Sequence, residues 1–262
     1  MDINKPVIVT ALFDIGRDKW DCFDQSYGGY VDWMERLLSF DCNMVIYTDA
    51  SLYDSIIARR IKYDADLSKT ITVVKPLEGH KAYQLFYDNL NTLMQSETFK
   101  KKIAFNVPEM TKPLYNIVMF NKVYFLQDCA KENYFDADLL IWMDAACYRE
   151  EIRDYNRPWP NLDKINQLAN KITFFSHHLE FSIFNRQDHL LSQMRIIQGG
   201  CFFVPKHLID RLSNAVTYHV MESISRGYIG SDEKIFDLCY LDNKEICQLI
   251  QCNWREYYNL FK

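Results

Sequence analysis

The chain has 262 residues, of which 48% are hydrophobic and 25% are charged, and its formal net charge is −5. This composition is typical of a soluble globular protein with one substantial core. The densest basic run is Lys100-Lys101-Lys102. Because nucleic-acid phosphates require a basic face, the acidic balance excludes a nucleic-acid partner from our expectations.

The first half of the chain alternates between strand-like and helix-like patterns. β-branched and apolar runs predict strands at 6–13, 43–48 and 71–74, and helical spacing predicts helices at 30–40, 80–94 and 115–133. Ser51 is predicted to cap another helix that runs to about Arg60, and residues 108–113 are predicted to form a loop. The most hydrophobic strand, DLLIWM at 138–143, should be central because parallel strands are covered on both faces.

The second half continues with strands predicted at 171–176 and 200–204 and helices at about 206–226 and 231–241. We see no repeat and no linker rich in Gly, Pro or Ser. The sequence therefore predicts a single domain over 1–262 with an α/β fold, in which a mostly parallel central sheet is flanked by helices.

The amino-terminal segment and the cysteines bear on the compartment. Residues 1–14 read MDINKPVIVTALFD and lack the features of a secretory signal. No stretch approaches the roughly 20 apolar residues of a transmembrane helix. The eight cysteines form no C-x-x-C pair, and several lie in apolar runs. We therefore expect a cytoplasmic protein with reduced thiols and no transmembrane segment.

Three aspartates follow three of the predicted strands. Asp14 follows the first strand in the loop FDIGR, Asp49 follows the second, and Asp144 follows the central strand. Ligands bind outside the carboxyl ends of parallel strands, so these carboxylates could converge on one crevice. An aspartate at a strand end also commonly starts a loop by hydrogen-bonding its own backbone. Both interpretations stay open.

Several well-known motifs are absent. The chain has no G-x-G-x-x-G after its first strand, no G-x-x-x-x-G-K-[ST] and no G-x-S-x-G. The sequence therefore gives no local indication of a dinucleotide-binding turn, a P-loop or a serine hydrolase.

Four segments together resemble the HtrL/YibB (WlaTB-like) family. They are VTALFDIGR with Trp20, PEMTKPLYNIVMFNKVYFLQDCAKENYFDADLLIWMDA, IIQGGCFF and GSDEKIF, and the resemblance runs from about Val7 to Cys239. That family is similar to the GT-A glycosyltransferases. The resemblance thus implies a GT-A-like fold with a Rossmann-like nucleotide-sugar-binding half at about 1–146 and an acceptor and catalytic half at about 147–262.

The resemblance also implies which residues contact a nucleotide-sugar donor. Thr10 and Ala11 would border the base, and Arg17 would face the diphosphate or the base. The remaining donor contacts that it implies would be Lys122, Asp144, Gly199 and Gly200. Asp14 and Asp49 join them as candidate donor contacts because of their positions at strand ends.

Asp232 and Glu233 match an acidic pair near the transferred sugar. In an inverting reaction one of them would accept the proton of the acceptor hydroxyl. In a retaining reaction they would orient the sugar hydroxyls or support the developing oxocarbenium charge. On spacing alone, residues 230–233 are also a good helix start, with a cap followed by acids. Two other candidates also have a purely structural interpretation. Lys122 could be an ordinary lysine that extends its charged end to water, and Gly199-Gly200 could mark a β-bulge.

Asp144 matches the first carboxylate of the GT-A D-x-D signature, but Ala146 occupies the position of the second. A hard divalent ion can bind through one or two carboxylates together with diphosphate oxygens and water. The resemblance therefore implies Mn²⁺ or Mg²⁺ bound by Asp144, with a second protein ligand still to be found.

The function expected from the resemblance is glycosyl transfer from a UDP- or GDP-sugar to the hydroxyl of a glycan or another acceptor. Ala146 supports an alternative, a non-catalytic nucleotide- or sugar-binding module of the same fold. A third possibility is an unrelated α/β hydrolase or nucleotidyltransferase that uses the same acids. The sequence leaves the oligomeric state open.

Overall fold

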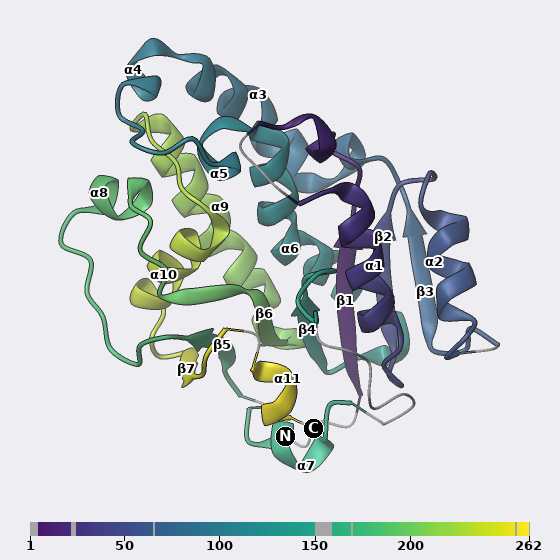
Figure 1. The fold of residues 1–262 in the computed structure, drawn as a ribbon. Coiled ribbons are helices and arrows are strands. Elements are labelled where there is room, and N and C mark those ends of the chain that lie inside the picture. The colour runs from purple at the N-terminus through teal and green to yellow at the C-terminus, as the bar shows by residue number, and fades with distance from the viewer. Residues whose placement is uncertain are drawn as a thin grey trace.

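The computed structural model describes residues 5–21, 25–64, 66–149, 159–168, 170–254 and 256–261. Within these residues seven strands form one sheet in the order β3-β2-β1-β4-β6-β5-β7 (Figure 1). The strands are β1 (Pro6–Leu12), β2 (Met44–Thr48), β3 (Thr70–Val74), β4 (Leu139–Met143), β5 (Ile172–Ser176), β6 (Ile197–Pro205) and β7 (Cys247–Gln251). All neighbouring pairs are parallel except that β6 runs antiparallel to β4 and β5.

Helices cover both faces of the sheet. On one face lie α1 (Tyr27–Leu38) and α2 (Tyr53–Arg60), and on the other α3 (Lys81–Gln95), α6 (Pro113–Lys131), α9 (Ile209–Ser225) and α10 (Asp232–Asp242). The shorter helices are α4 (Glu97–Lys100), α5 (Pro108–Thr111), α7 (Leu162–Asn166), α8 (Arg186–Leu191) and α11 (Tyr257–Leu260). Single 3₁₀ turns occupy Arg17–Lys19, Leu77–Gly79, Tyr134–Asp136 and Lys206–Leu208.

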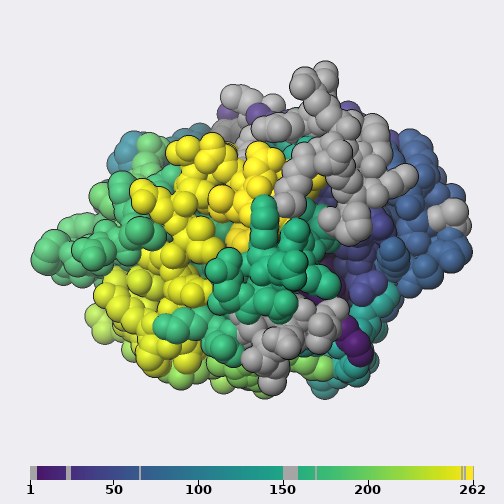
Figure 2. Space-filling model, turned by 90° about the horizontal axis from the view of Figure 1, so that it is seen from below, coloured from purple at the N-terminus to yellow at the C-terminus, as the bar shows by residue number. Residues whose placement is uncertain are grey.

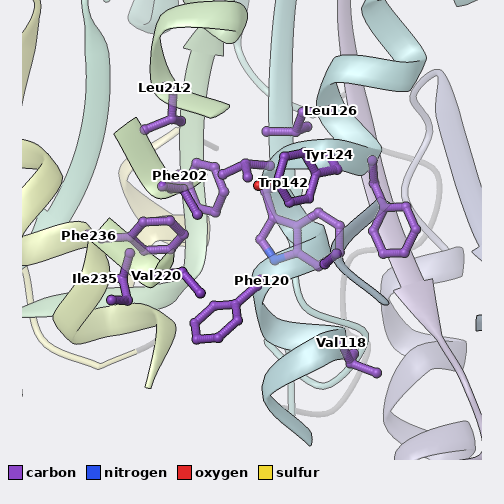
Figure 3. Close-up of a cluster of buried hydrophobic side chains, with 14 of the residues drawn as sticks. Val118, Phe120, Tyr124, Leu126, Trp142, Phe202, Leu212, Val220, Ile235 and Phe236 are labelled. Atoms are coloured by element: carbon purple, nitrogen blue, oxygen red, sulfur yellow. The ribbon is translucent and has the colours of Figure 1, made fainter. Parts of the chain in front are cut away.

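The central strands are apolar throughout because successive side chains serve opposite faces. In β1, Val7 and Val9 pack with α3 and α6, whereas Ile8 packs with α1. In β4, Trp142 joins the first of these clusters and Ile141 the second. Figure 3 shows Trp142 among the aromatic side chains of α6, β6 and α10, labelled Phe120, Tyr124, Phe202 and Phe236.

The predicted α/β class and mostly parallel sheet are confirmed, and β4 is the central strand as expected. Two local predictions are wrong. Residues 108–111 form helix α5 instead of a loop, because Pro108 occupies the first helical position, where a missing N–H costs little. Ser51 does not cap α2; its hydroxyl bonds the Asp49 carboxylate, and the helix begins two residues later, at Tyr53.

Strand β7 was not predicted, and it ties the end of the chain to the sheet. It pairs parallel with β5, beyond which α11 leads to the last described residues. The backbone N–H of Asn161 donates to the Phe261 carbonyl at 2.8 Å, and the Trp159 indole donates to the Tyr258 carbonyl at 3.1 Å. Figure 2 shows these yellow carboxyl-terminal residues beside the teal-green residues around α7. The sheet therefore includes strands from both halves of the sequence.

None of the helices in the described ranges has the length and apolar character that a membrane span would need. The cysteines that the structure describes are all free, and most of them are buried.

Arg60, at the end of α2, holds together the chain between α1 and β2. Its side chain is fully buried. The guanidinium donates to the carbonyl oxygens of Leu38 at 2.6 Å, Phe40 at 2.7 Å and Cys42 at 2.9 Å. The last carbonyls of a helix have no partner within that helix, so Arg60 supplies what α1 lacks.

Replacing Arg60 by leucine (Arg60→Leu) should reduce the free energy of unfolding by about 3–5 kcal/mol, because it leaves buried carbonyls without donors. The matched change Lys62→Leu, at an exposed lysine nearby, should cost less than about 1 kcal/mol. Urea denaturation of both variants measures the difference. Similar costs for the two would contradict the structural role of Arg60.

Candidate functional site

A cavity of about 260 Å³ lies at the carboxyl ends of β1 and β4. The chain proceeds from β1 to β2 on one side and later returns to β4 on the other, so the strand order reverses between β1 and β4. Open parallel sheets bind their ligands at such a switch point. The cavity is lined, among others, by Ala11 of β1, Arg17, Lys122, Asp144, Gly199 with Gly200, and Asp232 with Glu233.

Lys122, in the middle of α6, binds two carboxylates at once. Its Nζ lies 2.9 Å from Asp144 Oδ1 and 2.7 Å from Asp232 Oδ2. It also donates to the carbonyl oxygen of Gly199 at 3.0 Å. An ammonium group has three N–H donors, so this arrangement uses all of them. The side chain of Lys122 thus fixes α6, the end of β4, β6 and the start of α10 relative to one another.

Burial alone would lower the pKa of Lys122, but Asp144 and Asp232 outweigh burial and raise that pKa. The lysine is therefore charged at neutral pH. Burial raises the pKa of Asp232 above its usual range, and the Lys122 ammonium acts in the opposite direction. Without the ammonium group of Lys122, burial would favour the protonated form of Asp232 still further.

Asp144 is held from two further sides while its carboxylate faces the cavity. The indole Nε1 of Trp142 donates to Asp144 Oδ1 at 2.7 Å. The Asp144 backbone N–H donates to the Gly200 carbonyl at 2.8 Å. The Asp144 side chain remains 32% exposed. Trp142 therefore has a polar role in addition to its place in the core.

Glu233 lies next to this cluster and titrates near neutrality. Its Oε1 accepts from the Gly199 N–H at 3.4 Å, and its Oε2 lies 3.5 Å from Arg195 Nε. Burial, with Asp232 adding to it, raises the pKa of Glu233 to about 7. A carboxyl group with such a pKa can both accept and release a proton at neutral pH.

Gly199 allows the backbone of β6 to approach the two acids. A Cβ at this position would lie 2.5 Å from Asp232 Oδ2 and 3.0 Å from Glu233 Cγ, which is too close for any other residue without rearrangement. The register between β5 and β6 also shifts here, from Phe174 opposite Phe202 to Phe175 opposite Gln198. The bulge considered from sequence is therefore present, and it brings the strand up to the acids.

Arg17 lines the cavity and has no counter-ion among the residues that the structure describes. Its side chain is only 3% exposed and lies over the Tyr30 ring, 4.4 Å from the ring centre. One terminal nitrogen donates to the Phe13 carbonyl at 3.4 Å, and Nε has no partner. Among the described residues no carboxylate lies within ion-pair distance of Arg17. A buried, uncompensated guanidinium is well suited to bind a phosphate or carboxylate of a ligand.

Three of the residues named from the sequence do not line the cavity. Asp14 is exposed and accepts from the Gly16 N–H at 2.9 Å. Asp49 accepts from the N–H of Asp14 at 3.3 Å and from that of Ser51 at 2.9 Å. Such bonds to nearby backbone N–H groups are typical of an aspartate that starts a loop, which was one of the two interpretations of these aspartates. Thr10 is fully buried, and its Oγ1 has no partner. Donor contacts by these three residues stay a prediction.

The cavity also has lining residues that the sequence did not single out. Two are cations, Arg149 and Arg195, and two are tyrosines, Tyr30 and Tyr115. Arg149 follows Asp144 by five positions, and Arg195 lies two positions before the first residue of β6. Both arginines lie within a few residues of a predicted strand, and this position could have drawn attention to them in the sequence. No local pattern marks the tyrosines, because they resemble the other helix aromatics.

The described residues do not form a cation site around Asp144. The ammonium of Lys122 lies within 3.2 Å of both carboxylate oxygens of Asp144. Nowhere in the described ranges do three His, Cys, Asp or Glu side chains gather as metal ligands. A divalent ion beside Asp144 would therefore meet a fixed positive charge. The expected second ligand for Mn²⁺ or Mg²⁺ is not found among these residues, and we derive no step through a metal.

Fold and site together define an α/β protein with a charged ligand cavity at the switch point of its sheet. The model of a family described as "Bacterial protein of unknown function (HtrL_YibB)" matches residues 4–262. Protein HtrL of Escherichia coli (strain K12) is 21% identical over 270 residues, covering 97% of this chain and 90% of that protein. The chain belongs to the HtrL_YibB family, and the resemblance inferred from its motifs is confirmed.

Among solved structures, the apo form of mouse xyloside xylosyltransferase 1 is similar, with a TM-score of 0.48 and 12% sequence identity. The similarity covers 98% of this chain and 92% of that chain.

Glu233 should make a contribution to stability that is lost as the pH rises from about 4.5 to 7. In this window the folded chain retains a proton on Glu233 that the unfolded chain has released, so each rise in pH favours unfolding. In Glu233→Gln this contribution is absent, and the stability difference between variant and wild type should change by on the order of 3 kcal/mol across the window. Urea denaturation at a series of pH values measures it, with the exposed Glu132→Gln as control. An unchanged slope in Glu233→Gln would refute the assignment.

Proposed function

We propose that this protein is a GT-A-type glycosyltransferase, which transfers a sugar from a UDP- or GDP-sugar to the hydroxyl of a glycan or another acceptor. The supporting observation is that one cavity carries an uncompensated buried cation, Arg17, and a group of fixed acids around Lys122. A nucleoside diphosphate needs the first kind of group, and an acceptor hydroxyl that must lose its proton needs the second.

In this proposal Arg17 binds the diphosphate and stabilises the charge that develops as the bond from the anomeric carbon to the diphosphate breaks. Arg149 and Arg195 add positive charge to the same cavity. We assign the nucleotide to the walls contributed by residues up to about 146 and the acceptor to the walls contributed by later residues.

Glu233 is the proposed general base, in an inverting reaction. The acceptor oxygen attacks the anomeric carbon, the nucleoside diphosphate leaves, and the acceptor proton passes to Glu233. The choice between the two acids follows from their contacts: Asp232 Oδ2 is bound to Lys122 at 2.7 Å, whereas Glu233 has a pKa of about 7. In this proposal Lys122, held by Asp144 and Asp232, positions Gly199, whose backbone N–H bonds Glu233.

A second candidate is a non-catalytic nucleotide- or sugar-binding module. It is favoured by the contacts of Asp144, whose oxygens face Lys122 and Trp142, and by Ala146 in place of a second acid. Both candidates bind a nucleotide, so turnover distinguishes them.

Replacing Arg17 by glutamine should weaken the binding of UDP or GDP about 10- to 100-fold, because a charge-assisted bond to phosphate is lost. Lys19→Gln removes an exposed charge from the same turn and should leave the affinity unchanged. Isothermal titration calorimetry with UDP and GDP measures both variants. If neither nucleotide binds the wild-type protein, or if Arg17→Gln binds as tightly as wild type, the donor site proposed here is wrong.

The same titration in EDTA and in Mn²⁺ tests the metal expectation. Because Arg17 is the proposed anchor, we expect nucleotide binding to persist in EDTA. If nucleotide binding required Mn²⁺, a metal ion would hold the diphosphate. That ion would need a protein ligand other than the residues around Lys122.

The change Glu233→Gln should lower the rate of sugar transfer or donor hydrolysis about 10²- to 10⁴-fold and change nucleotide affinity less than about threefold. Release of UDP or GDP from a panel of nucleotide-sugars, with and without acceptors, measures the rate. Glu109→Gln, at another acid that lines the cavity, is the control and should retain most of the rate. Nucleotide binding with no turnover in the wild-type protein would favour the binding module.

A further inference from the structure

A second cavity, of about 660 Å³, runs along the carboxyl-terminal half of α6, and we call it the α6 groove. Its lining shares no residue with the lining of the first cavity. Three segments contribute to it: 75–84, between β3 and the first turns of α3; 121–131, on α6; and 206–210, before and at the start of α9. Its volume lies in the range of about 300–1,000 Å³ that small-molecule sites occupy.

The α6 groove has a surplus of positive charge. It is lined by two aspartates, Asp128 and Asp210, and by four lysines, Lys75, Lys81, Lys131 and Lys206. None of these lysines forms an ion pair with any described residue. The aspartates accept hydrogen bonds, Asp128 from the Tyr47 hydroxyl at 2.8 Å and Asp210 from the Gln127 amide at 2.7 Å. Two of the lysines donate to neutral amide oxygens, Lys81 to Gln127 at 2.9 Å and Lys206 to Asn133, and they keep their charge. In a chain with a net charge of −5, this surplus favours an anion.

Asn121 presents an unused hydrogen-bond donor to the groove. Its side chain is fully buried, and Oδ1 accepts from the Ala82 backbone N–H at 3.0 Å. This bond fixes which way the amide points, and Nδ2 is left without a partner. Buried polar groups in folded proteins nearly always have partners, so a group on a bound ligand would complete the hydrogen bonding of this amide.

His80 presents an unused acceptor to the same groove. Its side chain is 8% exposed, and Nε2 has no partner. The ring is held edge-on by Phe13 and Phe125, at 5.5 and 4.9 Å between ring centres. Burial lowers the pKa of His80, and a hydrogen bond to the Lys75 backbone acts the other way. In a neutral imidazole one nitrogen is a donor and the other an acceptor. With one nitrogen bonded to the Lys75 backbone, Nε2 is the acceptor.

The first turn of α3 adds a third feature. His80, Lys81 and Gln84 lie at the start of this 15-residue helix and line the groove. The first backbone N–H groups of a helix lack partners within it and attract negative charge. The groove therefore combines an anion-attracting end with one unused donor and one unused acceptor, and a hydroxyl group can bond either of them.

We propose that the α6 groove is a binding site for a sugar phosphate, whose hydroxyl groups bond His80 Nε2 and Asn121 Nδ2 and whose phosphate lies among the groove lysines at the start of α3. This site is separate from the cavity assigned to the nucleotide-sugar, and the proposal does not depend on glycosyl transfer.

Calorimetric titration of the full chain with glucose 6-phosphate tests the site, with inorganic phosphate and glucose as comparisons at equal ionic strength. We expect one glucose 6-phosphate per chain, bound at least tenfold more tightly than either comparison. The double variant Lys75→Gln/Lys131→Gln should weaken this binding at least tenfold. The control Lys19→Gln/Lys101→Gln removes two exposed lysines outside the groove and should not change it.

Two further variants distinguish binding in the groove from binding elsewhere on the chain. His80→Phe keeps a ring among Phe13 and Phe125 but removes Nε2, so it should weaken glucose 6-phosphate at least tenfold and leave inorganic phosphate unchanged. Arg17→Gln, in the first cavity, should leave glucose 6-phosphate binding unchanged. Circular dichroism checks folding, and if His80→Phe unfolds, the double variant of the groove lysines still decides the question.

Three results would overturn the proposal. The first is no binding of glucose 6-phosphate to the wild-type chain, and the second is equal affinity in the groove lysine variant. The third is loss of binding in Arg17→Gln, which would place the ligand in the first cavity. Inorganic phosphate bound as tightly as glucose 6-phosphate would refute the role of His80 and Asn121.

Discussion

The structure depends on one ammonium group in the middle of a buried helix. Lys122 bonds Asp144, Gly199 and Asp232, which are 22, 77 and 110 residues away in the sequence. A buried charge is tolerated only when it is paired and hydrogen-bonded, and each of these partners would be costly to bury without the lysine. The interaction therefore ties together a strand end, a bulged strand and a helix start that share no local sequence.

This arrangement also divides the first cavity by charge. The acids are gathered on the side of β6 and α10, where Lys122 compensates part of their charge, and Gly199 lets the backbone approach them. On the side of β1, Arg17 has no ion-pair partner within the described part of the chain. A ligand that is negative at one end and carries hydroxyls at the other would match both sides, and this is the reason for proposing a nucleotide-sugar as the ligand.

The two cavities meet at α6. Asn121 lines the groove and Lys122 lines the first cavity, and the two residues are consecutive. Successive residues of a helix point in directions about 100° apart, so a helix buried on most sides can present polar groups to two separate spaces. This accounts for buried polar residues at both positions in a helix whose neighbouring side chains are apolar.

Local patterns in the chain are enough to account for the layers of the fold. Apolar runs marked the central strands, and helical spacing marked α1, α3, α6 and α9, because burial on both faces or along one face leaves a periodic pattern in the chain. Local patterns also placed Asp144 at the end of the central strand. Local signals misled at Ser51 and Pro108, where a side-chain bond to Asp49 and a proline in the first helical position decided the outcome.

Which charged side chains meet depends on how the chain folds and has no local signal. The fragment GSDEKIF reads equally as a capped helix start, and nothing near Lys122 in sequence names Asp232 as its partner. The close approach of β6 to the acids, which requires Gly199, depends on the distance between remote segments. So do the unpartnered atoms of His80 and Asn121 and the lack of a counter-ion for Arg17 among the described residues. Periodicity records burial, which is a property of each residue, whereas pairing is a relation between residues that the fold alone brings together.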